Sequence, residues 1–573
     1  MKSSLVADFL VLMGFCSILY AIILFGKEWQ TAISPSPEID LNPTSLPKYA
    51  AFSVMRGFAA YFVSLGFALV FGSWAAKSAR AEKIILPLLD IGQSVPVLGF
   101  LPGLILTLVA IFPNTNVGVE IAAILMIFTS QAWNIAFSLH ASLKGVPRDL
   151  REVSDLMGLT PWQKFVRLEL PFSAVGLTWN SVVSMAGGWF FLTVCEAFSL
   201  GDRQYRLPGL GSWMATAIEK GDTVAMVLGV FTMCVVIIAI DVLVWKPVLN
   251  WVYRFRFDDS EILPEDEPLV ELILRESELY QSVLKFLRRN RVRMAKNFEN
   301  PQGPFSQVSK RLQKLFSFFN FFTFFKFLRW PFALITLVVV FYGVSRLTMV
   351  LADVSGEAWM RIFGDLGSSF LRVLGAVMLS SLWTLPFGIW VTRKQKRRKF
   401  FQPIIQLMAS FPAPMLFPLV VAFLLKLNWS FEIISMVLMF TGVQWYVLFN
   451  VLAGGARIPQ ELSLVTDMVS STAYQKWRYL YLPSVLPSLI TGLITAIGGA
   501  WNASIVSEYL VYQGKVFEAR GLGASISRAA ADGNYQVLAA SVLVMVGVVV
   551  FLNRTLWVYV FEWVRKRFGF ENM

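Results

Sequence analysis

Repeated runs of about 20 apolar residues constrain this chain more than any other feature of its sequence. A helix of that length crosses roughly 30 Å of hydrocarbon. Hydrophobic residue types make up 56% of the 573 residues and charged types only 15%, against about 25% charged residues in an average soluble domain. A soluble core cannot bury so much apolar surface, and disordered chains are far more polar. The sequence therefore predicts an all-α, polytopic membrane protein.

About twelve runs are long enough to be transmembrane helices. They cover residues 6–25, 50–76, 84–112, 119–141, 173–199, 223–247, 331–352, 366–391, 402–426, 431–453, 485–511 and 536–560. Lys and Arg gather in alternate loops, most densely in RKQKRRK at 393–399, and such loops lie in the cytoplasm. We therefore expect a multi-pass protein with both termini cytoplasmic. The same bias explains the net charge of +13 without a nucleic-acid partner; the lipid bilayer is the partner that this composition implies.

The two halves of the chain repeat each other at a nearly constant offset. The offset is 316 positions for Arg56 and Arg372, Pro87 and Pro403, and Pro96 and Pro412, and 312 positions for Trp133 and Trp445, Trp189 and Trp501, Glu196 and Glu508, and Gly211 and Gly523. Such regularity over Pro, Trp and Gly indicates an internal duplication. Because each half has an even number of spans, we expect two parallel six-helix repeats related by a roughly two-fold axis along the membrane normal.

These observations give the predicted domain organisation. The first repeat covers 1–255, a cytoplasmic linker covers 256–325, and the second repeat covers 326–573. The linker begins acidic and then becomes basic, and its aromatic end is typical of a helix lying at the membrane interface. It can serve as a simple tether, or its basic part can bind anionic lipid headgroups.

A long polar segment, VPRDLREVSDLMGLTPWQKFVRLELP, follows the fourth span at 146–171. Its pattern predicts a helix, a turn near 158–161 and a second short helix on the cytoplasmic side, with an apolar face that includes Leu156. An equivalent segment lies at 458–483. Two such elements in matching places indicate paired docking surfaces for a two-fold partner. The alternative is a pair of ordinary interfacial loops.

The segment at 146–171 resembles the EAA loop of ABC importer permeases. That loop has a Glu, a Gly six residues later, and an apolar-x-Leu-Pro ending after nine more residues, and the spacing here agrees throughout. The second copy has Leu464 in place of the Glu and Ser470 in place of the Gly, so we expect weaker or asymmetric docking there. The resemblance assigns ATPase coupling to Glu152, Leu156, Gly158, Leu168, Leu170, Pro171, Asp467, Ser470, Leu480, Leu482 and Pro483.

Other segments are similar to permeases of the nitrate, sulfonate, taurine and bicarbonate class. They include GQSVPVLGFLPGL at 92–104, GGWFFLTVCEAF at 187–198, ASFPAPMLFPLVV at 409–421 and GGAWNASIVSEYL at 498–510. The resemblance covers most of both halves. It implies a fused, type I ABC importer permease in a bacterial inner membrane. It also implies two copies of a cytosolic ABC ATPase, which would hold the ATP and Mg²⁺, and an extracytoplasmic solute-binding protein.

The sequence contains no motif for ATP hydrolysis or other catalysis that could drive transport. No G-x-x-x-x-G-K-[ST] segment is present, so a P-loop for ATP cannot form. With a single histidine, His140, and three cysteines inside apolar runs, we expect no catalytic residues, no metal site and no cofactor. We therefore predict a transport subunit and not an enzyme. The alternatives are a secondary transporter built from parallel repeats, and an ABC permease for a non-anionic solute.

A third set of residues consists of candidates for the translocation pathway. Arg56 and Arg372 are matched cations within spans, which either reach the headgroups or attract anions at the pathway. Glu196 and Glu508 are matched carboxylates, which are poor anion ligands and better suited to bonding backbone or loop groups. Further polar candidates are Ser94, Ser410, Trp189, Trp501 and Asn502. Four prolines, Pro96, Pro102, Pro412 and Pro418, are expected to interrupt helices near a cavity.

Overall fold

The computed structural model describes residues 2–31, 38–201, 203–255, 269–286, 337–338, 341–468 and 472–568. These form two compact units, one made of Met1–Tyr20 with Pro264–Val354 and one made of Ala21–Leu263 with Ser355–Met573. Most of both predicted repeats lies in the second unit. Much of the predicted linker, including its basic cluster and its aromatic end, falls outside the described residues, so the predicted boundaries at 255 and 325 stay predictions.

The second unit is almost entirely helical. Helix α1 (Lys2–Glu28) ends in it, and the first repeat continues through α2 (Leu46–Lys77), α3 (Ala79–Ser94), α4 (Leu101–Ile111), α5 (Val117–Lys144), α6 (Arg148–Leu156), α7 (Pro161–Lys164), α8 (Leu170–Cys195), α9 (Leu210–Lys220), α10 (Thr223–Ile240) and α11 (Lys246–Val252). The second repeat contains α16 (Gly356–Thr392), α17 (Gln395–Ser410), α18 (Ala413–Lys426), α19 (Phe431–Ala456), α20 (Gln460–Met468), α21 (Ala473–Lys476), α22 (Leu482–Ser507), α23 (Leu522–Ala531), α24 (Tyr535–Leu552) and α25 (Val558–Phe568).

Each repeat also carries one short β-hairpin. Strands β1 (Ala197–Leu200) and β2 (Arg203–Arg206) pair antiparallel, and β3 (Tyr509–Tyr512) and β4 (Lys515–Glu518) do the same. The strands of the two hairpins begin and end 312 positions apart, so the offset found in the sequence extends to the elements themselves. The hairpins were not predicted, and the expected spans at 173–199 and 485–511 end in them instead of continuing as helix.

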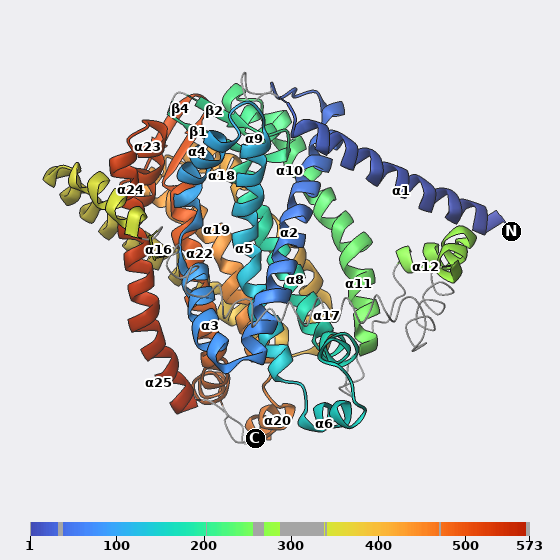
Figure 1. The fold of residues 1–573 in the computed structure, drawn as a ribbon. Helices are drawn as coiled ribbons and strands as arrows, with labels where there is room; N and C mark the ends of the chain where they lie inside the picture. Colours follow the sequence, from blue (N-terminus) through green and yellow to red (C-terminus); the bar gives the residue numbers. More distant parts are fainter. Residues whose placement is uncertain are drawn as a thin grey trace. The chain divides into compact units, whose positions relative to one another are not determined.

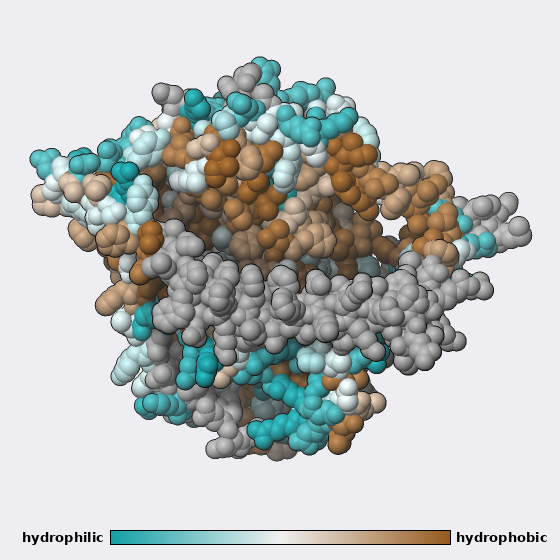
Figure 2. Space-filling view, in the orientation of Figure 1, coloured by the Kyte–Doolittle hydropathy of each residue, from teal (hydrophilic) through white to brown (hydrophobic). Residues whose placement is uncertain are grey.

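The long helices of the second unit run side by side (Figure 1). Helices α2, α5 and α8 pack in succession in the first repeat, and α16, α19 and α22 do the same in the second. Figure 1 shows α6 and α20 at one end of this unit and the hairpins with α9 at the other. In Figure 2, hydrophobic residues gather between hydrophilic residues at the two ends of the visible face. This is the distribution that a bilayer requires.

Two predicted spans are broken helices. The expected spans at 84–112 and 402–426 are each two helices, bent by 83° and 85°, so the predicted interruptions at Pro96 and Pro412 are confirmed. The cause is Pro96 and Pro412, because a residue before proline is driven out of helical conformation. Val95 and Phe411 accordingly have ψ angles of 129° and 130°.

The other two prolines do not interrupt helices as expected. Pro102 lies in the first turn of α4, where its missing N–H has no helical partner to lose. Pro418 lies inside α18, which continues past it. Only the prolines at the two bends therefore change the direction of the chain.

By length and composition, eight helices of the described residues can cross a membrane, or ten if each bent pair counts as one span. The predicted seventh span, 331–352, is described only in part, and its longest described piece is the apolar helix Phe341–Ala352. Helix α8 occupies the position of the predicted fifth span. The helical membrane fold is thus confirmed, whereas the full count of twelve spans stays a prediction.

The two repeats contact each other reciprocally. The N–H of Gly201, at the turn of the first hairpin, donates to Ala530 O at the end of α23 (3.0 Å). Gln513, at the turn of the second hairpin, lies against Gly221 at the end of α9. Gly201 and Gln513 are equivalent positions of the two repeats, so each hairpin turn meets the other repeat in the same way. A two-fold relation between the repeats requires such an exchange.

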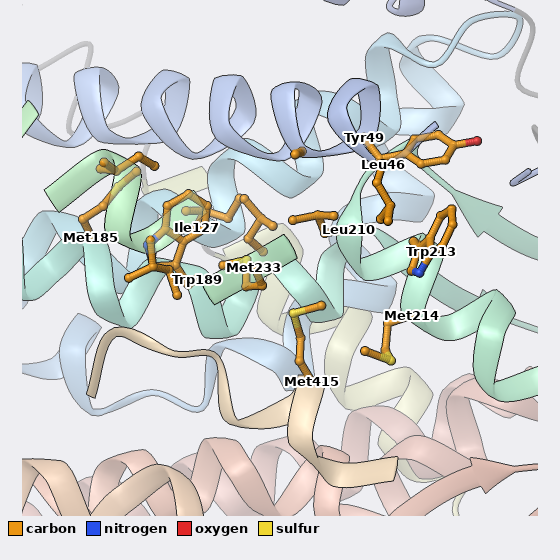
Figure 3. Packing of buried hydrophobic residues seen from close by; sticks show 14 of the residues in the cluster. Leu46, Tyr49, Ile127, Met185, Trp189, Leu210, Trp213, Met214, Met233 and Met415 are labelled. Carbon is orange, nitrogen blue, oxygen red and sulfur yellow. The ribbon is translucent and has the colours of Figure 1, made fainter. Parts of the chain in front are cut away.

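A large apolar cluster of the first repeat also includes one residue of the second. Most of its buried members come from α2, α5, α8, α9 and α10, and Met415 of α18 belongs to the same cluster. Figure 3 shows Met415 reaching this cluster, which contains Met214 and Met233. Methionine is flexible and fills irregular gaps, so Met415 can pack at the boundary between the two repeats.

The first unit contains the start of α1, α12 (Leu269–Glu276) and a helix over 278–286. The Asp8 carboxylate of α1 accepts hydrogen bonds from Ser277 Oγ (2.5 Å) and Leu279 N (2.9 Å). Asp8 therefore caps the helix that begins after Ser277. This contact ties the beginning of the linker to the first helix of the chain.

Candidate functional site

The segment at 146–171, called here the first loop, has the predicted helix-turn-helix form, and the segment at 458–483 is the second loop. Helix α6 ends at Leu156, and Gly158 follows with φ +66°, a left-handed conformation that glycine adopts without a steric penalty. The Thr160 side chain accepts from the N–H of Gln163, and the Gln163 side chain accepts from the N–H of Thr160. This capping box satisfies two backbone N–H groups at the start of α7.

A π turn joins α7 to α8 at 165–169. Pro171, in the first turn of α8, lacks an N–H, and its ring conflicts with the carbonyl of the residue four positions earlier, which favours a wider turn. The second repeat has the same π turn at 477–481 before Pro483. Pro171 and Pro483 thus have a structural role in both loops, and Leu168 and Leu170 lie half-buried beside the first of them.

The first loop exposes apolar side chains at the end of the unit where α6 lies (Figure 1). Leu156 is 87% exposed, and Met157 and Trp162 are also well exposed. Single exposed apolar residues are ordinary, but a group of large ones on a short polar helix marks a contact surface. Glu152 is exposed on the same helix.

The second loop has the same secondary structure but a different surface. Met468, at the position equivalent to Leu156, is 82% exposed, and Tyr474 and Tyr479 are exposed beside it. Leu480 is buried and Leu482 is partly exposed. Ser470 and the side chain of Asp467 lie outside the described residues, so the structure adds nothing about them. A coupling role for the predicted residues of both loops remains a proposal.

A buried ion cluster lies at the hairpin end of the first repeat. Arg56 of α2 donates Nε to Glu120 Oε2 (2.8 Å) and Nη2 to Glu120 Oε1 (2.7 Å), a bidentate pair. Its Nη1 donates to Glu196, just beyond α8. All three side chains are 0% exposed. Ser53 and the Gly211 N–H also donate to the Glu196 carboxylate (2.7 Å each).

The second repeat contains the same cluster at the equivalent positions. Arg372 pairs with Glu432 and Glu508, Ser369 Oγ contacts both oxygens of Glu508 (2.8 Å), and the Gly523 N–H donates to Glu508 (2.9 Å). One difference is large, because Glu432 is 53% exposed where Glu120 is fully buried. The second cluster therefore opens to solvent at one carboxylate.

These clusters settle one alternative that the sequence left open. Arg56 and Arg372 are buried, so the interpretation that they reach the headgroups is wrong. Both bind carboxylates of their own repeat, and a role in attracting anions stays a prediction that this pairing does not favour. The expected bonding of Glu196 and Glu508 to backbone or loop groups agrees with the contacts to Gly211 and Gly523.

Sequence reasoning missed Glu120 and Glu432 as partners of the arginines. The two glutamates are 312 positions apart, so the offset alone was a usable signal. Gly211 also lies very close to α8. A Cβ at this position would lie 2.4 Å from Thr193 O, so a larger residue does not fit there without a shift of the backbone. The first cluster is also covered by the end of α1, where the Phe25 ring lies 5.9 Å from the Arg56 guanidinium.

A small cavity lies between the repeats, at the bend between α17 and α18. It is lined by α8 and α10 of the first repeat, by the turn that follows α10, and by α17 of the second repeat. Two of the predicted pathway residues, Trp189 and Ser410, line it together with Met185, Asp241, Trp245 and Gln406. The structure thus brings Trp189 and Ser410 together from different repeats.

The remaining pathway candidates do not line this cavity. Trp501 is buried in α22, and its indole N–H has no hydrogen-bond partner among the described residues. Asn502 donates to Gly498 O (3.3 Å), and its side-chain oxygen likewise lacks a partner within the described part of the chain. Ser94 ends α3, and its side chain lies outside the described residues.

Comparison with known proteins agrees with this arrangement. The family described as binding-protein-dependent transport system inner membrane component matches the chain twice, over 68–245 and 384–562. The chain is 23% identical over 181 residues to the taurine transport system permease protein TauC of Escherichia coli (32% of this chain, 62% of TauC). It is 24% identical over 149 residues to the nitrate import permease protein NrtB of Leptolyngbya laminosa (26% of this chain, 52% of NrtB).

A third relative is the bicarbonate transport system permease protein CmpB of Synechocystis, which is 29% identical over 150 residues (26% of this chain, 52% of CmpB). The chain thus spans about half to three fifths of the length of these relatives. The two family matches lie one in each repeat and together cover more than half of the chain. The chain therefore belongs to the family of binding-protein-dependent transport system inner membrane components, and it contains that family's unit twice.

Proposed function

We propose that this chain is the complete membrane pathway of an ABC importer for a small solute that carries an anionic group. Both halves of the pathway belong to one chain. Two cytosolic ABC ATPase subunits would dock on the two coupling loops, and a solute-binding protein would deliver the solute at the hairpin end. The secondary-transporter alternative has no support in the family matches.

The observation that carries this proposal is the pair of coupling loops at one end of the unit (Figure 1). Each presents exposed apolar residues on a short helix, with Leu156 and Met468 in equivalent positions. Two short helices in equivalent places, each with exposed apolar side chains, fit a partner that has two copies. The relatives add the solute class, because their names specify import of taurine, nitrate and bicarbonate.

Copurification tests the proposal directly. The tagged chain, expressed with its partner ATPase and solute-binding protein, is expected to retain two ATPase subunits per chain. Loaded binding protein should stimulate ATP hydrolysis in proteoliposomes and drive solute uptake. Uptake that needs an ion gradient and proceeds without ATP or any ATPase subunit would instead establish a secondary transporter.

Membrane orientation gives a separate prediction. In a variant without Cys16, Cys195 and Cys234, a cysteine introduced at Thr160 should be labelled by an impermeant maleimide only from the cytoplasmic side. A cysteine at Gln513, in the hairpin turn, should be labelled only from the opposite side. The basic loops next to the coupling loops are the reason for this orientation. The reverse labelling pattern would place the ATPase surface outside the cell and contradict the proposal.

A further inference from the structure

The junction of α16 and α17, residues 393–399, is called here the basic segment. Six of its seven residues are Lys or Arg, and none is Asp or Glu. Its counterpart in the first repeat, 77–83, has three basic residues and one Glu. A modest excess of Lys and Arg is enough to keep a short loop in the cytoplasm. The basic segment therefore carries more positive charge than its topology requires.

The counterpart in the first repeat is held by ion pairs. Lys77 Nζ lies 2.6 Å from a Glu169 oxygen, and Lys144 Nζ lies 2.9 Å from a Glu82 oxygen. Glu82 also lies in the first turn of α3, where the helix dipole favours a carboxylate. Acidic residues of the first repeat thus offset much of the positive charge at this junction.

The second repeat lacks both of these acidic residues. Tyr481 stands at the position of Glu169, and Arg398 stands at the position of Glu82. Arg393 lies over the Tyr481 ring, 5.3 Å from its centroid. Helix α17 begins without an acidic residue in its first turn and without a side-chain cap. Because positive charge at the start of a helix is unfavourable, a bound anion would stabilise this junction.

Arg397 is placed to hold such an anion at the membrane interface. Its guanidinium carbon lies 4.2 Å from the centroid of the Trp390 ring, and its Nη1 donates to Trp390 O (3.3 Å). Trp390 is partly exposed and stacks on Phe387, and tryptophan is enriched at membrane–water interfaces. A guanidinium that lies against a ring keeps N–H donors at its edge for a phosphate. The first repeat has Ala81 at this position.

An exposed apolar stripe continues from the basic segment along α17. The stripe and the cation at its start are Lys396, Phe400, Ile404 and Met408. They follow at intervals of four residues, so they lie on one side of the helix, and the three apolar side chains are exposed. A phospholipid has a charged headgroup joined to acyl chains and can contact both parts at once. A free phosphate can contact only the basic part.

We propose that the basic segment binds the phosphate headgroup of an anionic phospholipid whose acyl chains lie along the apolar stripe of α17. This inference does not depend on which solute the protein transports. Helix α17 packs against α8 and α10 of the first repeat, so the bound lipid would stabilise a helix at the boundary between the repeats. The first repeat offers no equivalent site, because the Glu82 carboxylate would repel the headgroup there.

The experiment measures binding of dioctanoyl-phosphatidylglycerol to the purified full chain in neutral detergent by native mass spectrometry. Lys394→Gln combined with Arg397→Gln should weaken binding about thirtyfold, which is roughly fivefold for each basic residue. Four basic residues remain in the segment, so its membrane orientation is kept. Arg80→Gln combined with Lys83→Gln removes the same charge from the first repeat and should leave binding unchanged.

A charge-preserving pair separates loss of charge from loss of structure. Lys394→Arg combined with Arg397→Lys should bind the lipid as the unaltered chain does. If this pair binds as weakly as the Gln pair, the effect comes from altered structure and the proposal fails. Dioctanoyl-phosphatidylcholine should bind much more weakly than the anionic lipid, and equimolar inorganic phosphate should not displace the anionic lipid.

Four other results would overturn the proposal. Equal weakening by the Gln pairs of the two repeats would show general charge attraction without a site. Equal affinity for phosphatidylcholine would remove the need for an anionic headgroup, and displacement by inorganic phosphate would make the ligand a soluble anion. Unchanged lipid binding in the Lys394 and Arg397 Gln pair, together with loss of copurified ATPase, would make the basic segment a protein-docking surface.

Discussion

Leu156→Asp is expected to abolish solute uptake while the protein still inserts and folds. Leu156 is 87% exposed on α6, so its replacement removes no packing within the chain. In a docked complex the same position would be buried, and an unpaired carboxylate there would remain desolvated. Loss of a central apolar contact commonly costs about 2 kcal/mol or more in binding, so ATPase affinity should fall at least about thirtyfold. Copurified ATPase and ATP-driven uptake measure the effect.

The matched control lies at the other end of the unit. Val516 is an exposed apolar residue of the second hairpin, and Val516→Asp should leave ATPase copurification intact. Met468→Asp tests the second loop. We expect a smaller effect there, because the second loop departs from the EAA pattern at Leu464 and Ser470. ATPase association and uptake that both survive Leu156→Asp would show that α6 is not the docking helix.

Gly158→Pro tests the geometry of the loop independently of its surface. Gly158 has φ +66°, whereas proline fixes φ near −65°, so the turn between α6 and α7 cannot keep its form. Uptake should be lost together with ATPase association. Gly158→Ala should cost only about 1–2 kcal/mol and retain partial activity. Equal behaviour of the two variants would mean that the left-handed turn does not matter for coupling.

The sequence could predict the duplication and the helix-turn-helix form of the two loops, because both can be recognised from the order of residues alone. The offset of Pro96 and Pro412 is visible without any contact information. The interruptions at these prolines were predicted, but the bend angles of 83° and 85° were not, since a proline in the sequence indicates where a helix breaks and not the direction that the next helix takes. The hairpins were missed for a related reason. Residues 197–200 continue an apolar run, and only Gly201, with φ +55°, marks a turn there.

The ion clusters mark the limit of sequence reasoning more clearly. The offset selected Arg56 and Glu196 as matched residues, but nothing local relates positions that are 140 residues apart. Their contact depends on how α2, α5 and α8 pack. The sequence also gave no sign that Glu432 is exposed where Glu120 is buried, since exposure depends on what covers a position in the fold. The cavity around Asp241 is missed in the same way, because it combines two repeats.

Arg56→Gln is expected to lower the stability of the protein strongly, because Arg56 is buried together with two carboxylates. This expectation does not depend on whether the protein binds an anion. The change leaves Glu120 and Glu196 without their cation, and both side chains are 0% exposed. Breaking a buried ion pair by removing one partner costs about 3–5 kcal/mol. Arg56→Lys should rescue only in part, because lysine keeps the charge but cannot make the bidentate contact to Glu120. Yield and the thermal midpoint of the purified complex provide the measurement.

Arg372→Gln is the internal control that the duplication supplies. Its partner Glu432 is 53% exposed and can remain hydrated after the arginine is lost, whereas its other partner Glu508 is 0% exposed. Because only one carboxylate is then left buried without its cation, we expect a smaller loss of stability than for Arg56→Gln. Uptake per assembled complex should change little in either variant, because both arginines bind carboxylates of their own repeat. If instead stability is unchanged and normalised uptake falls in both variants, the arginines act on the solute. The clusters would then be part of the translocation pathway. They would not serve only to stabilise the packing of helices within each repeat.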